Sequence, residues 1–423
     1  MFTVLIIFLT QKIPARINVL HQNLRYRKSG GQSRIPIIED IDHFSTSTTK
    51  VKHALITLDP AAWLTALQQY PDIRLFNYFG LTFEIVKALN EAGYKVDIVD
   101  MNREHIPTKQ YDLLIGHGGK CRTIIEHLAP NSVIFQYVSG AYWRVFNEES
   151  KQRYERFAKS RGIDTQIKYV RDLSELLDGE EYLLQKADCL FFFNCPRTIE
   201  SFGIHRKKFF FTGFGAYTDP ALMISCDERN HNAGRRNFIY VGGTGGNVQK
   251  GMDILIEAFA KKPSLHLYIY CKVEKEIIDN YKKELSLPNI HYVYFLRYPI
   301  FSSIRKRLLQ KISFSVHAPI NTGLGTAFMG TMGLGLIPVG YVDLAENAEC
   351  TVLTDHWDVD SIANCISQAS EKSIEWCVNA STQITKEYEC LCGTESLRSK
   401  FKELFSDENV HALLQRRNVH PQV

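Results

Sequence analysis

The stretch that decides the fold reads NFIYVGGTGGNVQKGMDILIEAFAKK and covers residues 237–262. A run of β-branched and aromatic residues, typical of a buried strand, ends in Gly242, Gly243, Gly245 and Gly246. Lys250 and Gly251 follow, and an apolar helical pattern begins directly after them. Glycines let the backbone approach an anion, and a helix start offers unpaired N–H groups. The stretch therefore predicts a phosphate- or diphosphate-binding loop; a plain glycine turn beside an exposed lysine is the alternative.

Two familiar phosphate motifs are excluded. Gly251, rather than Ser or Thr, follows Lys250, so this is not a Walker A loop. The glycine spacing does not match the dinucleotide fingerprint either. The first strand candidate, HALITLDP (53–60), lacks a glycine loop.

A second stretch, SVHAPINTGLGTAFMGTMGLGLIPVGY (315–341), repeats the pattern of strand, loop and helix. Its strand ends at Pro319, and Gly323, Gly325 and Thr326 lead into a helix of small residues. Small side chains let a helix start lie close to a ligand at the edge of a sheet. Ordinary packing of a helix on a sheet explains the same residues.

Strand-like runs alternate with amphipathic stretches in both halves of the chain. In the first half they are 53–59, 95–100, 111–117, 132–138, 189–195 and 208–214; in the second, 237–243, 265–271, 289–296, 312–319, 336–341 and 351–354. Runs that are apolar on both faces are typical of parallel sheets covered by helices. Polar residues dominate 219–236, which is the best boundary between the halves. The chain is therefore predicted to be an α/β protein with two Rossmann-like domains facing across a cleft.

Composition excludes several classes of protein. The net charge of +4 is too small to indicate a nucleic-acid partner, and ten scattered cysteines suit a reduced, cytoplasmic protein better than a disulfide scaffold. Residues 1–52 hold eight Lys and Arg against three acidic residues. The basic charge of this tail indicates either a peripheral contact with the inner face of an anionic membrane or a solvated leader. Its apolar start, 1–10, is too short to span a bilayer. Residues 29–49 are typical of a linker, so folding is expected to begin near Val51.

Together, the two glycine-rich stretches resemble the nucleotide-sugar-binding half of GT-B glycosyltransferases, specifically the group 1, family-4-like proteins. The resembling segments are GGTGGNVQKGMDILIEAF and NTGLGTAFMGTMGLGLIPV. The amino half of the family is similar to GYKVDIVD and GEEYLLQKADCLFFFNCPRT of this chain. The 136–162 segment resembles a segment of bacterial surface-polysaccharide members. The implied segments are a tail and linker (1–50), an acceptor-side domain (51–220), a linker (221–236), a nucleotide-sugar-binding domain (237–385) and a helical segment returning to the first domain (386–423).

The resemblance implies a hexosyltransferase-type enzyme of polysaccharide biosynthesis. It would move a sugar from a nucleoside-diphosphate donor to a glycan or lipid-linked acceptor, with retained configuration and without a metal or other cofactor. Lys250 would neutralise the leaving diphosphate, and His117, at a strand end, would face the donor sugar. A histidine that caps the next helix is the plainer interpretation of His117. The implied donor-binding residues are Gly243, Thr244, Gly245, Gly246, Lys250, Thr322, Gly323, Gly325 and Thr326.

One departure from the family pattern leaves alternatives open. The family's two glutamates align with Thr322 and Gly330, so neither carboxylate is present, and its arginine after the strand aligns with Gly243. A catalytically degenerate binding or scaffold protein, or a nucleotide-sugar epimerase or hydrolase, therefore remains an alternative.

Three weaker features have plain structural interpretations. Asp358 and Asp360 precede an amphipathic stretch, where an aspartate caps a helix. The mixed charges of 148–161 predict an exposed helix. The basic residues near 297–311 favour a solvated face or a membrane contact over nucleic acid, because the fold supplies no element that reads bases.

Overall fold

The computed structural model describes residues 36–45, 51–69, 78–164, 166–167, 176–192, 195–203, 205, 209–211, 228–242, 245–293, 302–320, 326–342 and 348–419. The chain forms two compact units. The first combines Met1–Tyr137, Asp172–Phe191 and Phe401–Val423, and the second combines Val138–Arg171 and Phe192–Lys400. Residues 138–171 thus belong with the second half of the chain, whereas the sequence suggested the first.

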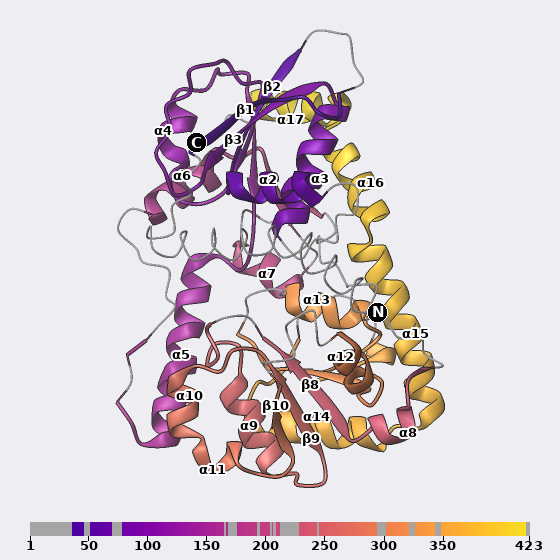
Figure 1. Cartoon of the computed structure of the whole chain (residues 1–423). Helices are drawn as coiled ribbons and strands as arrows, with labels where there is room; N and C mark the ends of the chain where they lie inside the picture. Colours follow the sequence, from indigo (N-terminus) through magenta and orange to yellow (C-terminus); the bar gives the residue numbers. More distant parts are fainter. Residues whose placement is uncertain are drawn as a thin grey trace, which may run out of the picture. The chain divides into compact units, whose positions relative to one another are not determined.

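The first sheet has the order β1-β3-β2-β4-β5-β6-β7. Figure 1 labels its strands β1, β2 and β3. The strands of this sheet are β1 (Ile37–Ile41), β2 (Lys52–Leu58), β3 (Tyr94–Asp100), β4 (Leu113–Gly116), β5 (Val133–Tyr137), β6 (Cys189–Phe192) and β7 (Phe209–Phe211). Around it are α2 (Pro60–Gln69), α3 (Tyr78–Glu91), α4 (Cys121–Glu126), α6 (Leu176–Lys186) and α17 (Asp407–Val419). The pairs β2–β3, β2–β4, β4–β5 and β5–β6 are parallel, which suits strands buried on both faces.

The expected start of the folded part, near Val51, is wrong. Strand β1 pairs antiparallel with β3 from Ile37 onward. The buried carboxylate of Asp97 holds the strand, because it accepts the Asp40 N–H at 2.6 Å and the Tyr111 hydroxyl at 2.6 Å. A buried carboxylate is costly unless donors surround it, so this pairing anchors the edge of the sheet.

The second sheet has the order β10-β9-β8-β11-β12-β13, and its strands are parallel. They are β8 (Asn237–Val241), β9 (His266–Tyr270), β10 (Ile290–Tyr292), β11 (Phe314–His317), β12 (Ile337–Gly340) and β13 (Val352–Leu353). Each run predicted as a strand overlaps a strand of the structure, and the α/β class with two Rossmann-like units is confirmed. Residues 193–194, 208, 212–214, 243 and 294–296 of these runs lie outside the described residues.

Helices pack against this second sheet in pairs. Helices α9 and α14 contact each other and the strands, and so do α13 and α15. The helices of this unit are α5 (Trp143–Arg161), α7 (Pro196–Ser201), α8 (His231–Gly234), α9 (Met252–Ala260), α10 (Lys275–Asn280), α11 (Lys282–Leu285), α12 (Ser302–Leu309), α13 (Thr326–Gly333), η6 (Ala348–Cys350), α14 (Val359–Glu371) and α15 (Ile374–Cys392); α16 (Thr394–Leu404) leads back to the first unit. Asp358 caps α14, accepting the N–H groups of residues 360 and 361, which confirms the predicted cap.

The helix predicted at 148–161 is confirmed, but the prediction that it is exposed is wrong for one of its faces. Helix α5 buries Arg153, Tyr154 and Phe157 against the second unit. The Arg156 guanidinium donates to the buried Asp253 carboxylate at 2.7 Å and also to Glu257. These partners lie about a hundred positions away in the sequence, so charge pattern along α5 alone gave no sign of them.

Arg417 connects helix α17 to the first sheet by hydrogen bonds. The Nε of Arg417 donates to Asp188 Oδ1 at 2.7 Å, and its Nη2 donates to the Ser132 carbonyl at 2.9 Å. Asp188 is nearly fully buried and also accepts the Ile134 N–H of β5 at 2.8 Å. Arg417 therefore supplies the positive charge for a buried carboxylate.

We expect Arg417→Ala to destabilise this region by about 2–3 kcal/mol, because it leaves the Asp188 carboxylate buried without a charge partner. Hydrogen exchange of the β5 and β6 amides would measure the loss as reduced protection. The exposed neighbour Arg416, changed to Ala, is the matched control. Equal protection in the two variants would contradict the proposed role of Arg417.

Candidate functional site

The two glycine-rich stretches meet at the point where the strand order of the second sheet reverses. Strand β8 pairs with β9 on one side and with β11 on the other. The chain therefore leaves the sheet in opposite directions after β8 and β11, and ligands of doubly wound sheets bind at such a switch point. The glycine loop (residues 242–251) and the second loop (residues 318–326) both begin at this edge.

The structure describes only some of the predicted donor-binding residues. Gly243, Thr244, Thr322, Gly323 and Gly325 lie outside the described residues, and Thr326 is described only as the start of α13. Gly245, Gly246 and Lys250 are described. Gly246 has a φ of +70° and Gly251 a φ of +75°, a region that favours glycine.

The Lys250 side chain folds over its own loop. Its Nζ donates to the Gly245 carbonyl at 2.5 Å. Burial lowers the pKa of Lys250, while the nearby Cys271 and the Glu274 carboxylate oppose this shift. The lysine thus brings a partly desolvated positive charge to the glycine loop, where it would act more strongly on an anion than in water.

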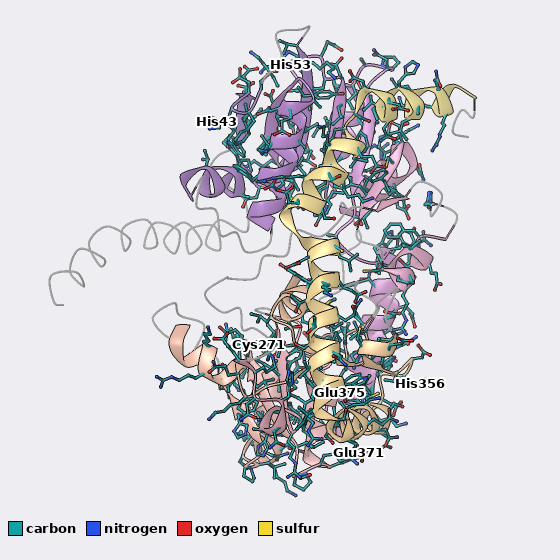
Figure 2. All side chains as sticks on the ribbon, turned by 90° about the vertical axis from the view of Figure 1, so that its right-hand side faces the viewer. His43, His53, Cys271, His356, Glu371 and Glu375 are labelled. Atoms are coloured by element: carbon teal, nitrogen blue, oxygen red, sulfur yellow. The ribbon has the colours of Figure 1, made fainter. Side chains whose placement is uncertain are left out.

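A carboxylate already occupies part of the glycine loop. The N–H groups of Gly246 and Asn247 donate to the two oxygens of Glu274, at 3.2 and 2.8 Å. In return, the Glu274 N–H donates to the Asn247 side chain at 2.7 Å. Glu274 and Cys271, which is labelled in Figure 2, both follow β9, the strand beside β8. Glu274 could not be identified from the sequence, because only the strand order places it beside the loop.

The two loops are tied to each other at their bases. The Ile320 N–H donates to the Gln249 carbonyl at 2.9 Å. A Cβ atom at Gly251 would lie 2.1 Å from the Ala318 carbonyl oxygen, so only glycine fits there. This close approach sets the spacing between the loops.

Helix α5 supports this junction. The fully buried Arg153 donates from Nη2 to the Ala318 carbonyl at 2.6 Å. Gln249, the residue before Lys250, donates to the Ser150 hydroxyl of α5 at 2.6 Å. Burial lowers the pKa of Arg153 to about 10, which leaves it charged at neutral pH. A helix from the first half of the sequence thus holds both loops.

His117 occupies the corresponding place in the first unit, at the end of β4 beside β2. Its N–H donates to the Thr57 hydroxyl at 2.6 Å, and its Nδ1 lies 3.0 Å from the Tyr137 carbonyl oxygen. A carbonyl only accepts hydrogen bonds, so Nδ1 carries a proton. The N-cap residue of helix α4 is Lys120, three residues after His117.

Neither a metal-binding cluster nor a membrane-spanning helix occurs among the described residues. Among them, no group of three or more His, Cys, Asp or Glu side chains is placed to hold a metal ion. Within the same part of the chain, no helix combines the length and the apolar character needed to cross a bilayer.

We expect the buried His317, at the end of β11, to lower the stability of the folded protein in acid. Burial lowers its pKa to about 3. The unfolded chain therefore binds a proton that the folded chain does not, and stability falls as the pH drops below the unfolded pKa of about 6.5. The expected loss from this group is about 2 kcal/mol at pH 5. Urea unfolding at pH 7 and pH 5 should show a smaller difference for His317→Asn than for the wild type, while the exposed His356→Asn keeps the full difference.

The fold has solved counterparts, although the sequence does not match known families. No protein-family model and no curated protein matches the sequence. Sucrose-phosphate synthase from Thermosynechococcus elongatus is similar in structure, with a TM-score of 0.58, 15% identity, and coverage of 86% of this chain and 100% of that one. Alr3699/HepE from Anabaena, solved with UDP and glucose, has a TM-score of 0.50, 11% identity, and coverage of 84% and 99%. With its two Rossmann-like units, the chain has the GT-B fold.

Proposed function

We propose that this protein is a glycosyltransferase that moves a sugar from a nucleoside-diphosphate donor to a glycan or lipid-linked acceptor. The observation that carries the proposal is the half-buried Lys250 on a glycine loop at the switch point of the second sheet. Alr3699/HepE, which is similar in structure, has been solved in complex with UDP and glucose and with UDP-glucose, which supports a donor of this class. Retention of configuration, independence from metal, and a role in bacterial surface glycans at the inner face of the membrane belong to the proposal.

In this proposal Lys250 stabilises the charge that develops on the leaving diphosphate. A preorganised positive charge needs little rearrangement during the reaction and is strongest where water is excluded. The backbone N–H groups of the glycine loop and the start of α13 would bind the phosphates and the sugar. In the same proposal, His117 faces the donor sugar and hydrogen-bonds to it or to the acceptor hydroxyl.

The Glu274 carboxylate should weaken donor binding, because it uses two loop N–H groups and repels an anion. We expect Glu274→Gln, which removes the charge and keeps the size, to tighten nucleoside-diphosphate binding roughly tenfold. Calorimetric titration would measure the change. Glu276→Gln removes the same charge two residues further along α10 and serves as the control. Weaker binding by the Glu274 variant would show that the carboxylate organises the loop instead.

A turnover assay distinguishes the proposed glycosyltransferase from a hydrolase, an epimerase and a binding protein. The transferase should release nucleoside diphosphate from a sugar nucleotide only when a suitable glycan or lipid-linked acceptor is present. Release without any acceptor would favour a hydrolase, and a changed sugar would favour an epimerase. Donor binding without turnover under any condition would favour the degenerate binding protein.

Gly330 stands where the family pattern has one of its two glutamates, and the structure shows whether a larger side chain would fit there. Gly330 lies within α13, and a Cβ atom there would meet nothing within 4 Å. The absence of a carboxylate is therefore not imposed by lack of space at this position, and Gly330→Glu can be examined in the same turnover assay.

A further inference from the structure

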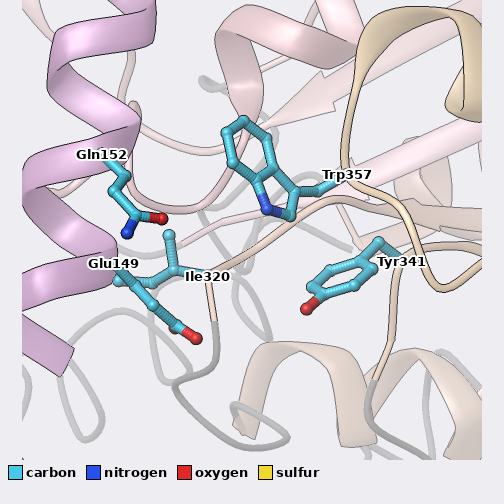
Figure 3. A pocket seen from close by; sticks show the side chains of 5 residues that line it. All are labelled: Glu149, Gln152, Ile320, Tyr341 and Trp357. Atoms are coloured by element: carbon cyan, nitrogen blue, oxygen red, sulfur yellow. The ribbon is translucent and has the colours of Figure 1, made fainter. Parts of the chain in front are cut away.

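A small pocket lies at the carboxyl edge of the second sheet, outside the glycine loop. It encloses about 50 Å³, and its lining comes from four separate parts of the second unit. The lining residues are Glu149 and Gln152 of α5, Ile320 after β11, Tyr341 after β12 and Trp357 before α14. Figure 3 shows the polar ends of the two α5 side chains turned toward the same space as the two rings.

Both aromatic rings are held in place by arginines. The Arg153 guanidinium lies 4.2 Å from the centre of the Trp357 ring, and Arg153 is itself fixed by its bond to the Ala318 carbonyl. The Arg197 guanidinium lies 4.0 Å from the centre of the Tyr341 ring and pairs with Asp355 at 3.2 Å. The rings therefore need little ordering when a ligand binds, which lowers the entropic cost of binding.

The charges around the pocket restrict its ligand. Two guanidinium groups against the rings disfavour a cation, and the Glu149 carboxylate disfavours an anion. The Gln152 amide nitrogen donates to Glu148 at 3.1 Å, so its carbonyl oxygen is an acceptor. Aromatic faces beside a carboxylate and an amide suit a ring that is apolar on its C–H faces and carries hydroxyl donors.

We propose that this pocket binds a neutral sugar ring of the acceptor. The volume takes one edge of such a ring and is too small for a nucleotide, since pockets for ligands of that size measure about 300 Å³ or more. Ile320 connects the pocket to the donor side, because its N–H donates to the carbonyl of Gln249, the residue before Lys250. This inference rests on the proposed function, which requires an acceptor close to the donor, and it assigns one acceptor sugar to the second unit rather than to the acceptor-side domain (51–220) expected from the sequence.

Saturation-transfer NMR with the full chain tests the inference. Neutral methyl glycosides of glucose, galactose and mannose are compared with glucuronic acid and glucosamine. At least one neutral glycoside should bind, and the Glu149→Ala/Gln152→Ala variant should bind it at least tenfold more weakly. Lys151→Ala/Glu155→Ala, which removes an exposed pair on the same helix, is the control and should bind like the wild type.

Three results would overturn the inference: no neutral glycoside binds, the charged sugars bind equally well, or the two double variants behave alike. UDP titration of the same samples separates this inference from the proposed function. Retained nucleotide binding without sugar binding rejects the acceptor pocket alone. Sugar binding at this pocket without nucleotide binding rejects the donor site alone.

Discussion

Replacing Gly251 with alanine should destabilise the second unit by about 3–5 kcal/mol, with loss of nucleotide binding. The residue has a φ of +75°, which costs a non-glycine residue about 1–2 kcal/mol. The added Cβ would also lie 2.1 Å from the Ala318 carbonyl oxygen, so one of the two loops must move. The same carbonyl accepts the hydrogen bond from Arg153, and the movement would disturb that buried contact as well. Urea unfolding followed by fluorescence would measure the loss of stability.

Gly162 provides the matched control for this prediction. It has a φ of +62°, but a Cβ atom there would meet nothing within 4 Å. Gly162→Ala should therefore cost only the backbone contribution, about 1 kcal/mol. Equal destabilisation by the two variants would contradict the inference that contact between the loops makes Gly251 necessary.

Replacing Lys250 with alanine should weaken nucleoside-diphosphate binding at least about 100-fold, which corresponds to about 3 kcal/mol. The structure places the positive charge of Lys250 on the glycine loop, and the partial burial of this side chain strengthens its attraction for an anion. Binding of the nucleoside without phosphates should hardly change. Calorimetric titration of both compounds measures the two effects.

Two further variants make the Lys250 result specific. Lys250→Arg keeps the charge and should retain part of the affinity. Lys261→Ala removes an exposed lysine beyond the end of α9 and should leave binding unchanged. A loss of affinity in Lys261→Ala as large as in Lys250→Ala would indicate a general effect of net charge.

The strands could be predicted from the sequence, whereas the switch point depends on strand order and could not. Most residues of β2, β3, β4, β5, β11 and β12 are buried on both faces, so the local composition of these runs already carries the signal. Strands β9 and β10 are only partly buried. Strand β1 was missed because its five residues lie between segments rich in Ser, Gly and Thr, which resemble a linker. Its stability comes from pairing with β3 and from Asp97, neither of which is local in the sequence.

The candidate site was predictable only in part. The glycine loop and Lys250 were identified because their motif is continuous in the sequence. Glu274 reaches the loop from the neighbouring strand, and Arg153 reaches the second loop from a helix more than 150 positions earlier. Such contacts depend on strand order and helix docking, and a single sequence contains no local pattern for either.

The central claim is that the second unit binds a nucleoside diphosphate at its switch point. Calorimetric titration of the full chain with UDP, GDP, ADP and CMP, in the presence of a metal chelator, tests it most directly. We predict micromolar binding of one nucleoside diphosphate and at least about 100-fold weaker binding of its nucleoside. A folded sample that binds none of these nucleotides would contradict the donor site and leave the degenerate scaffold as the better interpretation.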